Sequence, residues 1–105
     1  MDGRISVRYL QEYIRQKDHN PECIKDYALK LMEEVGELAF AVRKNQKAEN
    51  AQSIKNTIDE EVWDVIYYAL ALANLYDIDV EKVIEVKTRM SEEKYPSKVK
   101  FEMDR

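Results

Sequence analysis

Five acidic residues of this 105-residue chain are spaced so that they could hold a metal ion or activate water. Glu34 and Glu37 stand three residues apart, and Glu61 and Asp64 repeat that spacing. On a helix, each such pair shares one face. Glu33, directly before Glu34, is a further candidate. Because Asp64 lies in an otherwise almost wholly apolar stretch, a fully solvated position is not expected for it, and its charge needs a partner.

Carboxylates gathered between two helices oppose folding unless a cation joins them. Two unit charges roughly 4 Å apart repel by several kcal/mol at an effective dielectric of 20. A divalent cation reverses the sign of this interaction. Hard cations such as Mg²⁺, with Mn²⁺ as a substitute, prefer oxygen ligands, whereas the absence of nearby His or Cys argues against zinc. The sequence therefore predicts a magnesium site, and the alternative is two pairs of acids on solvated helix faces.

Other kinds of active site find little support in the sequence. A di-iron carboxylate bundle needs a Glu-x-x-His step on two helices, and no Glu is followed three residues later by His. The single histidine, His19, is expected in an exposed loop, and one histidine makes no catalytic triad. With only two glycines, the chain has no phosphate-binding Gly-rich loop. Gly36 lies inside the acidic motif, where it indicates either a close backbone approach or a tolerated helix glycine.

Helical periodicity predicts four helices that position these acids. We expect them at about Ser6–Lys17, from Asn20-Pro21 to about Val42, at about Ser53–Tyr76, and from Val80 to about Glu93. Asn20 and Asp79 are the expected caps of the second and fourth helices. The second half of the third helix is apolar almost all round, so it must be covered on most sides. Short connections favour a compact bundle.

Length and charge limit the remaining possibilities. We expect one domain over residues 1–105, with a modest core that a partner subunit completes. The net charge of −4 disfavours nucleic-acid binding. Cys23 is the only cysteine, so no intrachain disulfide can form. The N-terminus lacks an apolar core of signal-peptide length, and no apolar stretch is suited to a membrane. We expect a soluble, cytoplasmic protein.

Two stretches of the sequence resemble a known family. Residues 30–38 (KLMEEVGEL) and 60–66 (EEVWDVI) are similar to the EExxE and ExxD signature of MazG-like, all-α nucleoside-triphosphate pyrophosphohydrolases. Lys87, followed by Lys94-Tyr95-Pro96, is similar to a segment of the dCTP-pyrophosphatase branch of that family. The resemblance extends from about Tyr27 to Pro96.

This resemblance implies a four-helix MazG-like bundle completed by homo-oligomerisation into a dimer or a tetramer. It also implies Mg²⁺-dependent hydrolysis of nucleoside triphosphates, ribo or deoxyribo, to a nucleoside monophosphate and pyrophosphate. Two alternatives stay open. One is a phosphoribosyl-ATP pyrophosphohydrolase, and the other is a non-catalytic helical module that binds nucleotides or oligomerises.

The resemblance further implies roles for individual residues. Glu34, Glu37, Glu61 and Asp64 are expected to bind Mg²⁺ that bridges the phosphates. Glu33 is expected to orient or deprotonate water beside Glu34 and Glu37. Lys87 and Lys94 are expected to meet phosphate charge, and Tyr68 the nucleoside; as alternatives, the lysines are ordinary solvated residues and Tyr68 is core. Ser91 stands where the branch carries Asn, and His19 does not align with its base-contacting histidine, so the base preference stays open.

Overall fold

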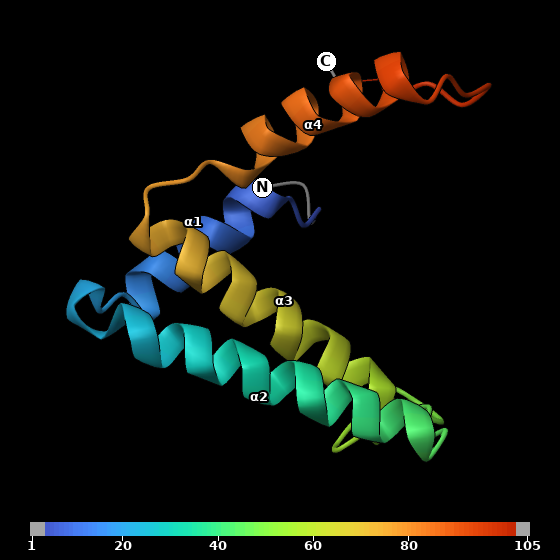
Figure 1. Ribbon diagram of the computed structural model, residues 1–105. Coiled ribbons are helices and arrows are strands. Elements are labelled where there is room, and N and C mark those ends of the chain that lie inside the picture. The colour runs from blue at the N-terminus through green and yellow to red at the C-terminus, as the bar shows by residue number, and fades with distance from the viewer. Residues whose placement is uncertain (1–3, 103–105) are drawn as a thin grey trace.

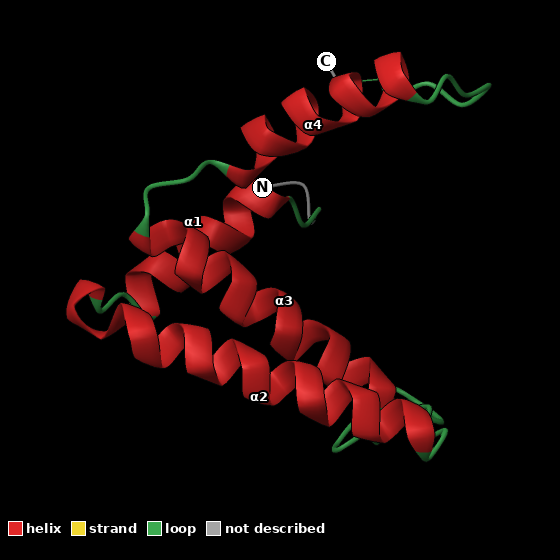
Figure 2. Ribbon diagram, viewed as in Figure 1, coloured by secondary structure: helices red, strands yellow, loops and turns green. Residues whose placement is uncertain are grey.

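The computed structural model describes residues 4–102, and this part of the chain folds into helices joined by short loops (Figures 1 and 2). The helices are α1 (Val7–Lys17), α2 (Ile24–Arg43), α3 (Ile58–Leu75) and α4 (Val80–Lys94), and a 3₁₀ turn, η1 (Pro21–Cys23), precedes α2. Between residues 4 and 102 there is no β-strand, which confirms the predicted all-α class. None of the helices described is both long and apolar enough to cross a bilayer.

The helices α2 and α3 form an antiparallel pair that packs along most of its length (Figure 1). α1 crosses the end of this pair where α3 finishes, and α4 packs mainly against α1. From there α4 projects away from α2 and α3 (Figure 1). A single chain therefore does not show the compact packing of all four helices that short connections favoured.

Three helices begin where a side chain caps the free backbone N–H groups of the first turn. Ser6, Thr57 and Asp79 each accept a hydrogen bond from the backbone N–H three residues later, at 3.0, 3.4 and 3.4 Å. The predicted cap at Asp79 is therefore confirmed. Each cap fixes the residue at which its helix starts.

Two predicted helix starts were wrong. The third helix begins at Ile58 rather than Ser53, because Asn56 has a left-handed backbone with φ of 62°, which a helix cannot continue through. Asn20 does not cap the second helix. Its side-chain amide instead donates to the Tyr27 hydroxyl at 2.9 Å, so a 3₁₀ turn separates it from the start of α2.

The apolar core is small and lies where α1, α2 and α3 meet. Its buried members are Ile14, Tyr27, Leu70 and Ala71. Half-buried apolar side chains from α1 and α3, among them Leu10 and Leu72, pack around them. The core thus holds together one end of the α2–α3 pair, and the other end depends on contacts between these two helices and on the loop that joins them.

A buried polar contact ties α1 to both α3 and α4. The side chains of Gln11 and Asn74 are 4% and 0% exposed. The Gln11 amide nitrogen donates to Asn74 Oδ1 at 2.9 Å, and the Asn74 amide donates to the Gln11 backbone carbonyl at 2.9 Å. Gln11 Oε1 then accepts from the Val80 backbone N–H at 3.0 Å. Since Val80 is the first residue of α4, this contact fixes where α4 departs.

Large apolar side chains remain exposed on the outer sides of α2 and α3. They are Leu29, Met32, Val35, Phe40 and Val42 on α2, and Val62, Trp63 and Ile66 on α3. The expectation that α3 is covered on most sides is therefore not met within one chain. Apolar surface of this extent is typical of an interface.

Candidate metal centre

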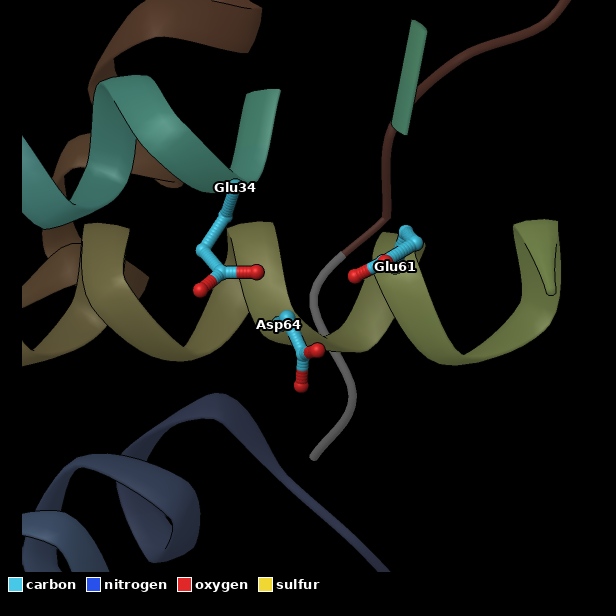
Figure 3. A group of neighbouring side chains, drawn as sticks. All are labelled: Glu34, Glu61 and Asp64. Atoms are coloured by element: carbon cyan, nitrogen blue, oxygen red, sulfur yellow. The ribbon is translucent and has the colours of Figure 1, made fainter. Parts of the chain in front are cut away.

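Three carboxylates converge between α2 and α3 (Figure 3). Glu34 comes from the middle of α2, and Glu61 and Asp64 come from the first two turns of α3. Each contributes one carboxylate oxygen to a group in which all three oxygens lie within 4.8 Å of one another. Glu34 and Glu61 are each only 6% exposed, whereas Asp64 is half-buried. The spacing predicted a pair of acids from each helix, and in the structure both acids of α3 meet one acid of α2.

The start of α3 brings Glu61 and Asp64 to this position. Thr57 caps the helix, and the Glu61 backbone N–H donates to the Thr57 carbonyl at 3.0 Å in the first turn. Asp59 ties the same turn to the preceding loop, since it accepts from Lys47 Nζ at 2.8 Å and from the Ala48 backbone N–H at 2.7 Å. These bonds fix the rotation of α3, so that its acidic pair faces α2.

Each of the two buried carboxylates has one oxygen without a hydrogen-bond partner. Neither Glu34 Oε1 nor Glu61 Oε1 has a partner within the described chain, and a buried charge without a partner is costly. Burial raises the pKa of Glu34, the neighbouring Glu37 and Asp64 add to this, and Lys30 opposes it. Burial, with the charges of the surrounding carboxylates, raises the pKa of Glu61 to about 7.

A divalent cation fits this donor set. The three converging groups offer only carboxylate oxygens, and hard ions such as Mg²⁺ and Mn²⁺ prefer such ligands. One ion would supply the partner that both orphaned oxygens lack and would offset the mutual repulsion of the carboxylates. Without a cation, the repulsion between these carboxylates destabilises the folded protein. The cluster is therefore the place where a counter-charge would be most stabilising.

The remaining acidic candidates lie at the edge of the cluster. Glu37 is exposed and outside the group of three converging oxygens, but it is near enough to raise the pKa values of both Glu34 and Glu61. The Glu33 side chain is 65% exposed and faces Lys30, with 3.6 Å between Glu33 Oε1 and Lys30 Nζ. Both carboxylates are therefore open to solvent.

Tyr68, the candidate nucleoside contact, is half-buried near the cluster. Its ring makes an edge-to-face contact with Tyr67, with 5.0 Å between centroids. Tyr68 lines a hollow of about 270 Å³ together with Lys30, which also lies 3.6 Å from Glu34 Oε2. The hollow thus adjoins the carboxylates. The remaining lining residues are Asp18, Asn20, Asp26 and Tyr27.

The two lysines predicted to meet phosphate lie elsewhere in the chain. Lys87 and Lys94 are exposed on α4, which packs mainly against α1, and Lys94 Nζ lies 5.5 Å from the centre of the Tyr95 ring. A single chain does not bring them to the carboxylates.

Gly36, inside the acidic motif, was expected either to allow a close backbone approach or to be a tolerated helix glycine. A Cβ placed there would meet no atom within 4 Å. The close backbone approach is therefore absent, and the glycine is simply tolerated.

Two residues beside the site were not recognised as candidates from the sequence. Asp18, directly after the first helix, accepts hydrogen bonds from the hydroxyls of Tyr27 at 2.6 Å and Tyr67 at 2.7 Å. Nothing in the local sequence marks this bond to a tyrosine 49 residues away. Lys30 pairs with Glu33 and Glu34. It stands three and four residues before them, a spacing that predicts ion pairs on one helix face. His19 is exposed, as predicted.

Comparison with known proteins gives a consistent result. Residues 23–98 match the MazG nucleotide pyrophosphohydrolase domain. Two structures of iMazG from Vibrio DAT 722 superpose with TM-scores of 0.79 and 0.81, each at 36% sequence identity. They cover 84% and 89% of this chain, and 99% and 100% of the iMazG chains. A third iMazG structure matches at 38% identity with a TM-score of 0.64, over 71% of this chain and 95% of that one. No curated protein matches.

Proposed function

Because this chain belongs to the MazG family and is a nucleotide pyrophosphohydrolase, we propose that it hydrolyses ribo- or deoxyribonucleoside triphosphates to monophosphate and pyrophosphate with Mg²⁺. The observation that carries the proposal is the pair of buried carboxylates, Glu34 and Glu61, each with one oxygen that has no partner. A family that acts on phosphoanhydrides needs a counter-charge for phosphate, and a cation held by this cluster would provide it.

Glu34, Glu61 and Asp64 are the proposed metal ligands, and Glu37 completes the set from the exposed side. Bound there, Mg²⁺ or Mn²⁺ would neutralise phosphate charge and make water more acidic. Glu33 is the proposed base, because its exposed carboxylate can reach solvent while Lys30 restrains it. A carboxylate so placed can orient water and accept its proton.

Tyr68 is the proposed nucleoside contact, since it lines the hollow that adjoins the carboxylates. Lys87 and Lys94 are the proposed phosphate contacts. Because α4 packs mainly against α1 of its own chain, these lysines reach a carboxylate cluster only if α4 moves or if a second copy supplies them. Support for a second copy comes from the exposed apolar sides of α2 and α3. We therefore propose a homodimer or a homotetramer.

The test is pyrophosphate release from a panel of ribo- and deoxyribonucleoside triphosphates, with Mg²⁺, with Mn²⁺ and without metal. Asp64→Asn and Glu37→Ala should each abolish release while the helical circular dichroism is retained. Glu93→Gln removes a carboxylate from the exposed end of α4 and serves as the control that keeps activity. Metal-independent turnover, or full activity in Asp64→Asn, would refute the proposal.

Adding phosphoribosyl-ATP to the panel, and measuring nucleotide binding beside turnover, separates the remaining alternatives. Turnover of phosphoribosyl-ATP alone would replace nucleoside triphosphates as the substrate class. Tight nucleotide binding without product would favour a sensing module. The rates of pyrophosphate release across the panel also show which base the enzyme prefers.

A further inference from the structure

Lys30 lies one helical turn before Glu34 and pairs with the carboxylates of the site. Its Nζ is 3.6 Å from Glu34 Oε2 and 3.6 Å from Glu33 Oε1. Both distances are longer than a hydrogen bond, and the Lys30 side chain is 45% exposed. The ammonium group is therefore held by charge rather than by a fixed hydrogen bond, and its four-carbon stem leaves it free to move.

The pairing of Lys30 with Glu34 competes with a metal ion. Glu34 presents one buried oxygen without a partner and one oxygen that faces Lys30. A divalent cation at the cluster would place two positive charges close to the Lys30 ammonium, and the two cations would repel each other. Metal binding to Glu34 therefore favours departure of Lys30.

The hollow beside the cluster offers Lys30 a place to go. Lys30 already lines it together with Tyr68. Two acids line the hollow. Asp18 has both carboxylate oxygens occupied by the hydroxyls of Tyr27 and Tyr67, so it is a weak competitor for the ammonium, whereas Asp26, one helical turn before Lys30 on α2, adds negative charge that favours the ammonium on this side. A triphosphate on the metal brings several negative charges to the boundary between cluster and hollow, and Lys30 stands at that boundary.

We propose that Lys30 exchanges partners during binding: it neutralises Glu34 in the metal-free site, leaves it when a divalent cation binds, and then contacts a phosphate of the nucleotide. This inference rests on the proposed function: its first half on the proposed metal site, and its second half on the nucleotide substrate. It makes Lys30 a substrate-contacting residue supplied by the same chain as the carboxylates, whereas Lys87 and Lys94 lie on α4.

The experiment compares Lys30→Met with Lys30→Arg and with Lys25→Met. Lys25 is exposed on the same helix, nine residues before Glu34 and hence on the opposite side, so Lys25→Met removes the same charge away from the site. Mn²⁺ binding without nucleotide is measured by electron paramagnetic resonance. Lys30→Met should bind Mn²⁺ about 3- to 10-fold more tightly than wild type, while the two other variants stay within about twofold.

Nucleotide binding should change in the opposite direction. At saturating metal, Lys30→Met should raise the KM for the nucleoside triphosphate by about tenfold, the effect of losing one charge-assisted contact. Lys30→Arg should recover much of this loss, and Lys25→Met should show none. A purely structural lysine would not tighten metal binding while weakening the nucleotide. Circular dichroism confirms the fold, and Lys30→Gln replaces Lys30→Met if the latter is unfolded.

Two results would overturn the exchange. Equal or weaker Mn²⁺ binding by Lys30→Met would show that Lys30 does not compete for Glu34, and an unchanged KM would show that it does not contact phosphate. If the wild type binds Mn²⁺ but releases no pyrophosphate, the proposed function fails. In that case the Mn²⁺ comparison and the dissociation constant of a non-hydrolysable triphosphate still decide the role of Lys30.

Discussion

Glu61→Gln should make the metal-free protein more stable at about pH 8. Its carboxylate places an oxygen within 4.8 Å of oxygens of Glu34 and Asp64. Two unit charges at this separation repel by about 3 kcal/mol at an effective dielectric of 20, and the partial exposure of Asp64 reduces the effect. We expect the free energy of unfolding to rise by about 1–3 kcal/mol. For a domain of this size, this raises Tm by about 4 °C or more.

Mg²⁺ should reverse the order of stability. A ligand present at a thousand times its Kd stabilises the folded state by about 4.1 kcal/mol, and wild type should gain close to this amount while Glu61→Gln gains little. Urea unfolding at fixed protein concentration, followed by helical circular dichroism with and without Mg²⁺, measures both effects. Glu93→Gln, on the exposed end of α4, should change stability by less than about 0.5 kcal/mol. A metal-free Glu61→Gln that is less stable than wild type would refute the reasoning.

Three further predictions concern pH, the buried amide contact and the apolar face. The pKa of Glu61 is about 7 against an ordinary 4.5, so the folded state holds this proton more tightly. The stability of the metal-free protein should therefore fall as pH rises from about 5 to about 8, and urea midpoints that rise instead would contradict this. Asn74→Ala leaves the buried amide of Gln11 with fewer partners and should cost about 2 kcal/mol of unfolding free energy, with faster hydrogen exchange at the start of α4; an unchanged midpoint would contradict it. Phe40→Glu, at a side chain 53% exposed on α2, should shift sedimentation toward the monomer, and an unchanged oligomer would exclude this face.

Much of the fold could be predicted because it depends on local chemistry. Asp79 caps α4 as expected, and the apolar periodicity placed the four helices. The late start of α3 could not be foreseen, since the polar residues before Thr57 are compatible with a helix. The left-handed backbone at Asn56, with its N–H bonded to Glu60 at 2.8 Å, becomes visible only once the chain has folded.

In the site, too, contacts between residues close in sequence could be predicted, and contacts between distant residues could not. The spacing of Glu61 and Asp64 predicted a shared face, and the structure places them against Glu34. The bond between Tyr67 and Asp18 joins residues 49 positions apart, so no periodic pattern could reveal it. The distance of α4 from the carboxylates also could not be predicted, because its direction depends on tertiary contacts at its first turn.

Because α4 is held at its N-terminal end, a small rotation there moves its C-terminal end by a larger distance. Its first turn is held by the Gln11 bond to Val80 and by Arg8, whose guanidinium bonds Asp79 at 3.0 Å. From Val80 to Lys94 the axis runs for about 21 Å, so a tilt of about 10° at the root moves the far end by about 4 Å. A substitution that never touches Lys94 can therefore re-aim it by more than the length of a hydrogen bond.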